Sequence, residues 1–280
     1  MSKISRALIG KGSTIAYPII TAIFMIVPEN AFNSVKICKD WSDTRSILIN
    51  RLIVCVVVFI VSDLIYWVYR KNRKKVIVKG SDFSIQIEYA NLMDIPSGKV
   101  VITFDECFTT KVGIEPGDIK AGSVCGQYLE KYKIKNYGQE LNIQELIVNS
   151  GIKPAKGKSK YKGQTRYTPG TIIQNGNDLL VAFAKIDENG RGHLTYDEYL
   201  DCLDKLWEQI DIYHGTDDVY VPILGSRITY FDKAFTQQEL LDIMINSYSL
   251  SPKKLKEPNI LHIVCKEREG FSVNDAFGVE

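Results

Sequence analysis

The residues best placed to do chemistry in this chain lie in two glycine-containing loops, each of which follows a predicted strand. The first loop, residues 120–127, has the sequence KAGSVCGQ and leads into a predicted helix, and the second, residues 222–229, has the sequence PILGSRIT. Small residues let backbone amides approach an anionic oxygen, and a helix N-terminus adds partial positive charge. A single loop of this kind is often an ordinary chain reversal, but two on neighbouring strands could hold a diphosphate between them. The loop residues predicted to bind a ligand are Lys120, Ala121, Gly122, Ser123, Val124, Gly126, Leu224, Gly225, Ser226, Arg227, Ile228 and Thr229.

Two adjacent acids, Asp105 and Glu106, follow a strand that is predicted to end at Phe104. We place Phe104 and Asp105 in the predicted binding site. An acid beside a nucleotide most often accepts hydrogen bonds from ribose hydroxyls, although two neighbouring carboxylates could also support hydrolysis. Neither Ser123 nor Ser226 has a histidine at a spacing that suggests nucleophilic catalysis. We therefore predict no catalytic residue, and an enzyme remains the weaker alternative.

Two other motifs invite a functional interpretation. Residues 187–198, DENGRGHLTYDE, nearly match a calcium-binding EF-hand loop. Arg191 would put a positive charge at a ligand position there, so we predict a strand-to-helix turn. Residues 153–166 carry six basic residues and no acid. This segment is either a solvated loop or a contact for anionic lipid or for ligand phosphates.

Metal and nucleic-acid binding have little support in the composition. The six cysteines include no CxxC pair, no cysteine–histidine metal spacing is present, and the net charge is only +2. The basic segment has only Tyr161 and Tyr167 for stacking against bases. We therefore predict no metal site, no cofactor and no nucleic-acid partner.

The elements that must position the two loops alternate between strands and helices, which predicts an α/β fold with a mixed sheet covered by helices on both faces. Two of the predicted helices begin with capping boxes, formed by Thr195 with Glu198 and by Thr236 with Glu239. Asn175-Gly176 indicates a hairpin turn. Strands are predicted over residues 76–78, 83–89, 99–104, 170–174, 179–185, 218–224 and 260–265, and helices over residues 126–135, 195–210 and 236–247.

Residues 1–75 hold two apolar stretches, which predict a transmembrane helical hairpin. The second, residues 47–69, would span about 34 Å as a helix, enough for a hydrocarbon core of about 30 Å. The first, residues 14–27, would span about 21 Å and must include residues 7–13 to cross. Basic residues gather before the first stretch and after the second, so the positive-inside rule places both termini in the cytoplasm of a two-span inner-membrane protein. A signal peptide followed by a buried core helix is the alternative, but no cleavage site of small residues is evident.

The loops together resemble those that grip the diphosphate of ADP-ribose in macrodomains. VVITF with FDECF resembles the first strand-and-loop signature, AGSVCGQYL the glycine-rich loop, and PILGSRITYF the second phosphate loop. Asn91 stands where many macrodomains have an adenine-contacting aspartate, and the first loop lacks the usual asparagine pair. These departures weaken the case for catalytic hydrolysis more than the case for binding.

A two-helix anchor, residues 1–75, followed by a macro-like nucleotide-sensing domain, residues 76–280, resembles the ThsA effectors of type II Thoeris anti-phage defence. The resemblance implies a nucleotide second messenger, an ADP-ribose derivative of the histidine-ADP-ribose type, made by a TIM-domain partner protein. It also implies that binding drives homo-oligomer assembly and disruption of the lipid bilayer. A membrane-tethered ADP-ribosyl hydrolase and a scaffold that binds ADP-ribosylated protein are the alternatives.

Overall fold

The computed structural model describes residues 3–35, 41–226 and 229–279, so the predicted site residues Arg227 and Ile228 lie outside the described residues. The chain forms two compact units, which meet between Arg73 and Lys74. The sequence places this boundary two residues later, at the end of the basic run that follows the second apolar stretch.

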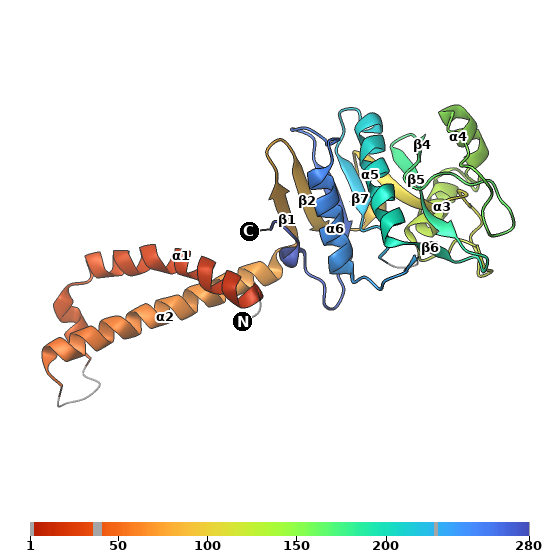
Figure 1. Ribbon diagram of the computed structural model, residues 1–280. Helices are drawn as coiled ribbons and strands as arrows, with labels where there is room; N and C mark the ends of the chain where they lie inside the picture. Colours follow the sequence, from red (N-terminus) through yellow and green to blue (C-terminus); the bar gives the residue numbers. More distant parts are fainter. Residues whose placement is uncertain (1–2, 36–40, 227–228, 280) are drawn as a thin grey trace. The chain divides into compact units, whose positions relative to one another are not determined.

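The N-terminal unit is a pair of helices joined by a short 3-10 helix. Helix α1 covers Lys3–Ile26, η1 covers Glu29–Asn33 and α2 covers Asp43–Asn72. The two long helices run antiparallel and side by side (Figure 1). Tyr17 of α1 meets Phe59 of α2 edge to face at 5.5 Å between ring centroids. Nearer the bend, the guanidinium of Arg51 lies 5.4 Å from the ring centroid of Phe24.

Polar side chains of α2 tie down the bend between the helices. Arg51 pairs with Glu29 at 3.3 Å and stacks over Phe32 at 5.3 Å, while Asn50 Nδ2 donates to the backbone oxygens of Phe32 and Val35. Arg51 is thus held within its own hairpin, where aromatic faces and a carboxylate compensate its charge.

Among the described residues, α2 is the one helix long and apolar enough to cross a membrane. Only 6% of its most apolar window is buried within the protein, unlike the core helix of a globular domain. The apolar part of α1, Gly12–Ile26, is shorter, and as a helix it would span about 22 Å. A second span would therefore have to use the more polar residues before Gly12.

The C-terminal unit is built on one mixed sheet of nine described strands, in the order β1-β2-β9-β7-β3-β5-β6-β8, with β4 paired to β5. Strands β2, β9, β7, β3 and β5 run parallel and form its centre, whereas β1, β4 and β6 pair antiparallel with their neighbours. Their bounds are β1 Lys75–Lys79, β2 Ser84–Tyr89, β3 Lys99–Asp105, β4 Ile172–Asn175, β5 Asp178–Ile186, β6 Gly192–Leu194, β7 Val219–Pro222, β8 Tyr230–Phe231 and β9 Leu261–Cys265.

Helices cover both faces of the sheet, and each face has its own core. Helices α5, Tyr196–Tyr213, and α6, Gln237–Leu250, lie side by side over one face, where Trp207 and Met244 are buried (Figure 1). Helices α3, Val124–Lys135, and α4, Ile143–Ser150, cover the other face. The central strands are buried on both sides, as continuous apolar runs require. The predicted α/β fold with helices on both faces is thus confirmed for this unit.

The local signals in the sequence are largely confirmed. Both capping boxes form, at Thr195 with Glu198 and at Thr236 with Glu239. The β4–β5 hairpin is present, but its turn lies one residue later than predicted. Asn175 pairs with Asp178 across the ladder, so the two turn residues are 176 and 177, and positive φ falls on Gly176. Glycine accepts that conformation most easily, which sets the register. Helix α4 and the short strands β6 and β8 are not predicted.

Candidate functional site

The carboxyl ends of the parallel strands open into a single cavity of about 830 Å³. It is lined at the strand ends by Phe104 and Asp105 of β3, Pro222 of β7 and Cys265 of β9, together with Ala184 near the end of β5. In open α/β sheets, ligands bind in the crevice outside the carboxyl ends of the strands, because backbone loops and helix N-termini converge there. A cavity of this size falls within the range for small-molecule and cofactor sites.

The first predicted loop contributes to the cavity through its end at α3. Ser123 caps this helix: its hydroxyl donates to Lys120 O at 2.6 Å and accepts from Gly126 N at 3.0 Å. Lys120, Ser123 and Val124 line the cavity, whereas Ala121, Gly122 and Gly126 are not among the lining residues. Gly126 is needed for packing instead, since a Cβ there would lie 2.4 Å from the backbone oxygen of Lys120.

The second predicted loop reaches the same cavity. Leu224, Gly225, Ser226 and Thr229 all line it. Gly225 has φ of +79°, and a Cβ at this position would lie 2.5 Å from the ring of Phe231. The two loops therefore share one cavity, as a clamp for a single ligand requires.

The buried carboxyl of Asp105 is the most distinctive polar group of the cavity. Its Oδ1 accepts from the backbone N–H groups of Cys107 at 2.8 Å and Thr109 at 3.2 Å, while its buried Oδ2 has no hydrogen-bond partner. Burial raises the pKa of this carboxyl above its ordinary value. Asp105 is one of the residues that line the cavity, so this buried carboxyl belongs to the cavity wall.

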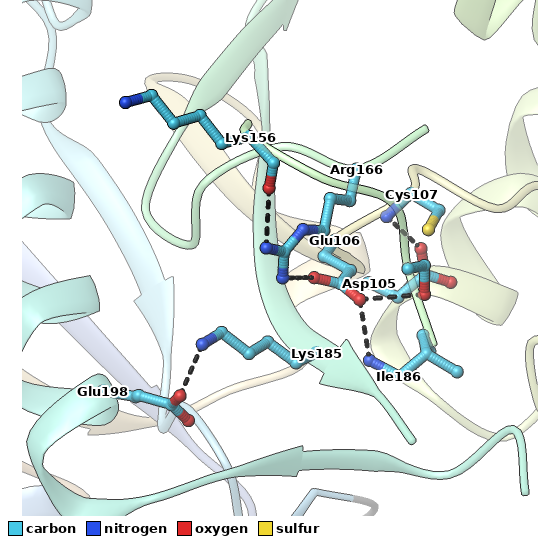
Figure 2. A network of polar contacts seen from close by, with 9 residues as sticks. Asp105, Glu106, Cys107, Lys156, Arg166, Lys185, Ile186 and Glu198 are labelled. Atoms are coloured by element: carbon cyan, nitrogen blue, oxygen red, sulfur yellow. Dashed lines mark hydrogen bonds and ion pairs between the residues drawn. The ribbon is translucent and has the colours of Figure 1, made fainter. Parts of the chain in front are cut away.

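Glu106, the next residue, points into the protein instead and does not line the cavity. Its Oε1 accepts from Ser159 Oγ at 2.9 Å and from Ile186 N at 3.2 Å, and its Oε2 lies 3.6 Å from a guanidinium nitrogen of Arg166. Figure 2 shows this carboxylate held between Arg166 and the backbone of Ile186, with Asp105 beside it. The two acids therefore do not face one another across the cavity as a pair for hydrolysis would.

Other polar groups of the cavity come from segments that the sequence did not predict as a site. Residues 114 and 116–120 form one wall, and the β5–β6 turn, residues 188–192, forms another. They touch at two glycines: Gly117 N donates to Gly190 O at 3.0 Å. The glycine-rich character of both turns was the available signal. Cationic side chains of the cavity are Lys120, Arg191, Lys266 and Arg268, and acidic ones are Asp105, Asp118 and Glu188.

The near-match to an EF-hand forms a β-turn that joins strands β5 and β6, so the predicted strand-to-helix turn is wrong: the helix α5 begins only after β6. Asp187 Oδ1 accepts from the backbone N–H groups of Arg191 at 2.8 Å and Asn189 at 2.9 Å. These bonds hold the pKa of Asp187 below its ordinary value. Glu198, at the last position of the motif, pairs with Lys185 and caps α5. Within the described residues, no group of three or more potential ligands could hold a metal ion.

The cavity offers no activated thiol. Cys125 and Cys265 line it, and burial raises the pKa of both, so they stay protonated at neutral pH. Cys107 lies close by, and burial raises its pKa to about 12.

Residues 85–266 match the model of the family described as "Thoeris protein ThsA, Macro domain". The chain belongs to this family. The matched segment of the ThsA macro domain contains both glycine loops, Asp105 and the whole β5–β6 turn. The helical pair, residues 3–72, lies outside it.

Individual proteins extend this similarity. The Thoeris protein ThsA of Bacillus amyloliquefaciens (strain Y2) is 26% identical over 266 residues, which cover 90% of this chain and 85% of that protein. A mutant macrodomain of Oceanobacillus iheyensis with ADPR has 11% identity and a TM-score of 0.44, over 72% of this chain and 92% of that one. The macrodomain of Thermus aquaticus DarG has 11% identity and a TM-score of 0.37, over 65% and 97%.

Asn91, which stands at the adenine-contacting position by resemblance, sits just outside the cavity of this ThsA macro domain. Its neighbours Ala90 and Leu92 line the cavity, but Asn91 itself does not. Its side chain caps η2, Leu92–Asp94: Nδ2 donates to Asp94 Oδ2 at 2.8 Å and Oδ1 accepts from Met93 N at 3.4 Å. A contact between Asn91 and an adenine ring stays a prediction.

Proposed function

We propose that this chain is a membrane-bound receptor for an ADP-ribose derivative and acts as an effector of anti-phage defence. The observation that carries the proposal is the cavity that both glycine loops share, with the buried carboxyl of Asp105 in its wall. A ligand hydroxyl, such as that of a ribose, would complete the hydrogen bonding of this carboxyl. Family membership supports the setting, because the family is that of the Thoeris protein ThsA macro domain.

The diphosphate of the ligand would lie between the N-terminus of α3 and the turn at Gly225. The helix end supplies backbone N–H groups and partial positive charge. Arg268 stabilises the second loop, since its guanidinium donates to Ser226 O at 3.0 Å. Arg191 and Lys266 add positive charge to the cavity wall.

Binding without turnover is the proposed mode of action. A hydrolase would need a second group to activate water beside Asp105. The adjacent carboxylate, Glu106, is engaged by Ser159, Ile186 and Arg166 away from the cavity. Neither Cys125 nor Cys265 is ionised enough at neutral pH to serve as a nucleophile.

The effector step is proposed to use the helical pair as a two-span membrane anchor, with both termini in the cytoplasm. The proposal is supported by the apolar side chains of α2, which are not buried within the protein. A large exposed apolar surface is unfavourable in water and is typical of a helix that contacts lipid. In this proposal a TIM-domain partner makes a signal of the histidine-ADP-ribose type. Ligand binding then favours assembly of the protomers. Such a shift requires that the ligand binds the assembled state more tightly than the unassembled one.

Two measurements test the proposal. Isothermal calorimetry of the full chain in detergent should detect binding of ADP-ribose derivatives and not of adenosine alone. Liposomes that carry the full chain should release a trapped dye only when that ligand is added. Binding without leakage would refute the effector role, and turnover of ADP-ribosylated protein would replace the receptor with a hydrolase.

A further inference from the structure

The basic segment of the sequence is an ordered strap, residues 155–166, and not a solvated loop without structure. Its two arms pair as antiparallel chain: Ala155 N donates to Arg166 O at 2.8 Å, and Ser159 N donates to Gln164 O at 2.9 Å. A bridge between Lys158 and Thr165 lies between these bonds. The strap therefore keeps a defined place against the cavity.

Its base is fixed by the buried carboxylate of Glu106. Ser159 and Arg166 both bind this side chain, and a second guanidinium nitrogen of Arg166 donates to Lys156 O at 2.8 Å (Figure 2). Tyr167 N, just after the strap, donates to Glu106 O at 2.7 Å. Glu106, the residue directly after Asp105, thus holds the strap. This couples the position of the strap to the cavity wall.

The tip of the strap reaches the cavity itself. Tyr161 lines the cavity, and its hydroxyl donates to Pro116 O at 2.5 Å. A Cβ at Gly117 would lie 2.3 Å from the Tyr161 ring, so the tip packs directly on the wall formed by residues 116–120. Lys160 and Lys162, which flank Tyr161 in the sequence, are therefore next to a residue of the cavity wall, although neither lines the cavity itself.

These lysines are exposed. Lys158 Nζ contacts Thr165 Oγ1 at 2.9 Å, and Lys162 Nζ lies 4.8 Å from the centroid of the Tyr161 ring. Among the described residues, none of the lysines 156, 158, 160 and 162 forms an ion pair with a carboxylate. Uncompensated charge beside a cavity raises the local concentration of an oppositely charged ligand and its association rate.

We propose that this strap captures the anionic ligand, and that its lysines steer a nucleoside-diphosphate group toward the cavity. This inference rests on the proposed function, because it assumes that the cavity binds such an anion. The strap acts on the association rate constant and leaves dissociation unchanged, since its exposed lysines meet the ligand before the ligand is enclosed. Anionic lipid headgroups share the same charge, and the test below separates the two.

The test compares two double variants that remove the same charge. The strap variant is Lys160→Gln with Lys162→Gln, and the control is Lys135→Gln with Lys256→Gln. Lys135 ends α3, about 17 Å from the cavity end of that helix, and Lys256 precedes β9, a strand that reaches the cavity at its other end, Cys265. Stopped-flow association of ADP-ribose is measured with the full chain in phosphatidylcholine nanodiscs at a series of salt concentrations.

The strap variant should associate about threefold more slowly than the unsubstituted chain at 0.1 M salt and about eightfold more slowly at 0.01 M salt, and the control, whose charges lie farther from the cavity, should be slowed less at both. These values correspond to removing two charges about 10 Å from a doubly charged ligand in water, with Debye lengths of about 10 and 30 Å. The two variants should converge at 1 M salt, and their dissociation rates should agree.

Equal association rates in the strap and control variants would overturn the inference while leaving the proposed function intact. A difference that appears only in nanodiscs containing phosphatidylglycerol would assign the strap to lipid headgroups and would also overturn it. If the unsubstituted chain shows no binding of ADP-ribose or its derivatives, the proposed function itself fails and this inference with it.

Discussion

Replacing Asp105 with asparagine should weaken ligand binding while leaving the fold intact. Oδ1 of Asp105 is already bound to the N–H groups of Cys107 and Thr109, so we expect a ligand hydroxyl to reach Oδ2, which neighbouring groups cover in the free protein. In Asp105→Asn the amide oxygen must keep facing these two donors, and the NH2 group takes the place of Oδ2. One charge-assisted bond of about 1.5–3 kcal/mol is then replaced by a neutral one of about 1 kcal/mol. We expect a loss of about 1–2 kcal/mol, or about 5- to 30-fold in affinity.

The same substitution should change how stability depends on pH. Burial raises the pKa of Asp105 in the folded protein, so the native state holds this proton more tightly than the unfolded chain does. Its contribution to stability is therefore complete below the unfolded pKa of about 3.9 and is lost as the pH rises through the folded pKa. Asparagine does not titrate. The stability of Asp105→Asn relative to the unsubstituted chain should thus increase with pH above about pH 4. At neutral pH the variant should be the more stable of the two.

Calorimetry with an ADP-ribose derivative and thermal unfolding of the full chain at several pH values check both effects. Asp178→Asn is a matched control, because burial also raises the pKa of Asp178, which starts β5 at the end away from the cavity. This control should shift stability in the same direction without changing affinity. An affinity for Asp105→Asn within twofold of the unsubstituted chain would refute the role given to Oδ2. A lower melting temperature at pH 7 would show that the carboxylate is structural.

Three further substitutions test other parts of the argument. Gly190→Ala should lower both stability and affinity, because its Cβ would lie 2.5 Å from the backbone nitrogen of Gly117. Gly176→Ala, also at positive φ but in open space, should cost only about 1 kcal/mol of stability. Equal effects of the two substitutions in thermal unfolding and calorimetry would contradict this reasoning. Val57→Arg in α2 should reduce the share of the expressed protein found in the membrane fraction, because inserting arginine into a membrane helix costs about 2.5–3.5 kcal/mol. Val148→Arg, at an exposed position of α4, should leave that share unchanged. Equal membrane fractions for the two variants would count against a membrane role for α2. Thr236→Ala removes the cap of α6 and should lower the free energy of unfolding by about 1 kcal/mol in urea titrations; an unchanged midpoint would show that the box adds nothing.

The parts of the fold that the sequence predicted are those with strong local signals. Both capping boxes place a helix start at the observed residue, because the interaction closes within four residues. The buried strand before Asp105 follows from its continuous β-branched run. By contrast, α4 has eight residues and β8 has two, too few for a periodic pattern to stand out. The register of the β4–β5 hairpin depended on which residue of the turn takes positive φ.

The candidate site divides in the same way. Both glycine loops could be found from the sequence, since small residues after a strand are visible without knowing what lies opposite. The walls made by residues 116–120 and 188–192 could not, because their contact joins segments about seventy residues apart through Gly117 and Gly190. The latter segment was predicted to be a strand-to-helix turn that resembles a calcium loop, since its acids and glycines satisfy a local turn.

The sequence by itself determined that this chain joins an apolar helical segment to an α/β domain with two glycine loops at strand ends. Composition and short-range periodicity are enough for that, because burial and helix capping act locally. The sequence placed Asp105 in the site, but only the tertiary structure showed that its neighbour Glu106, of the same chemical type, points away from the cavity. Arg166 and Ser159, more than fifty residues away, hold the carboxylate of Glu106 inside the protein, whereas Asp105 lines the cavity.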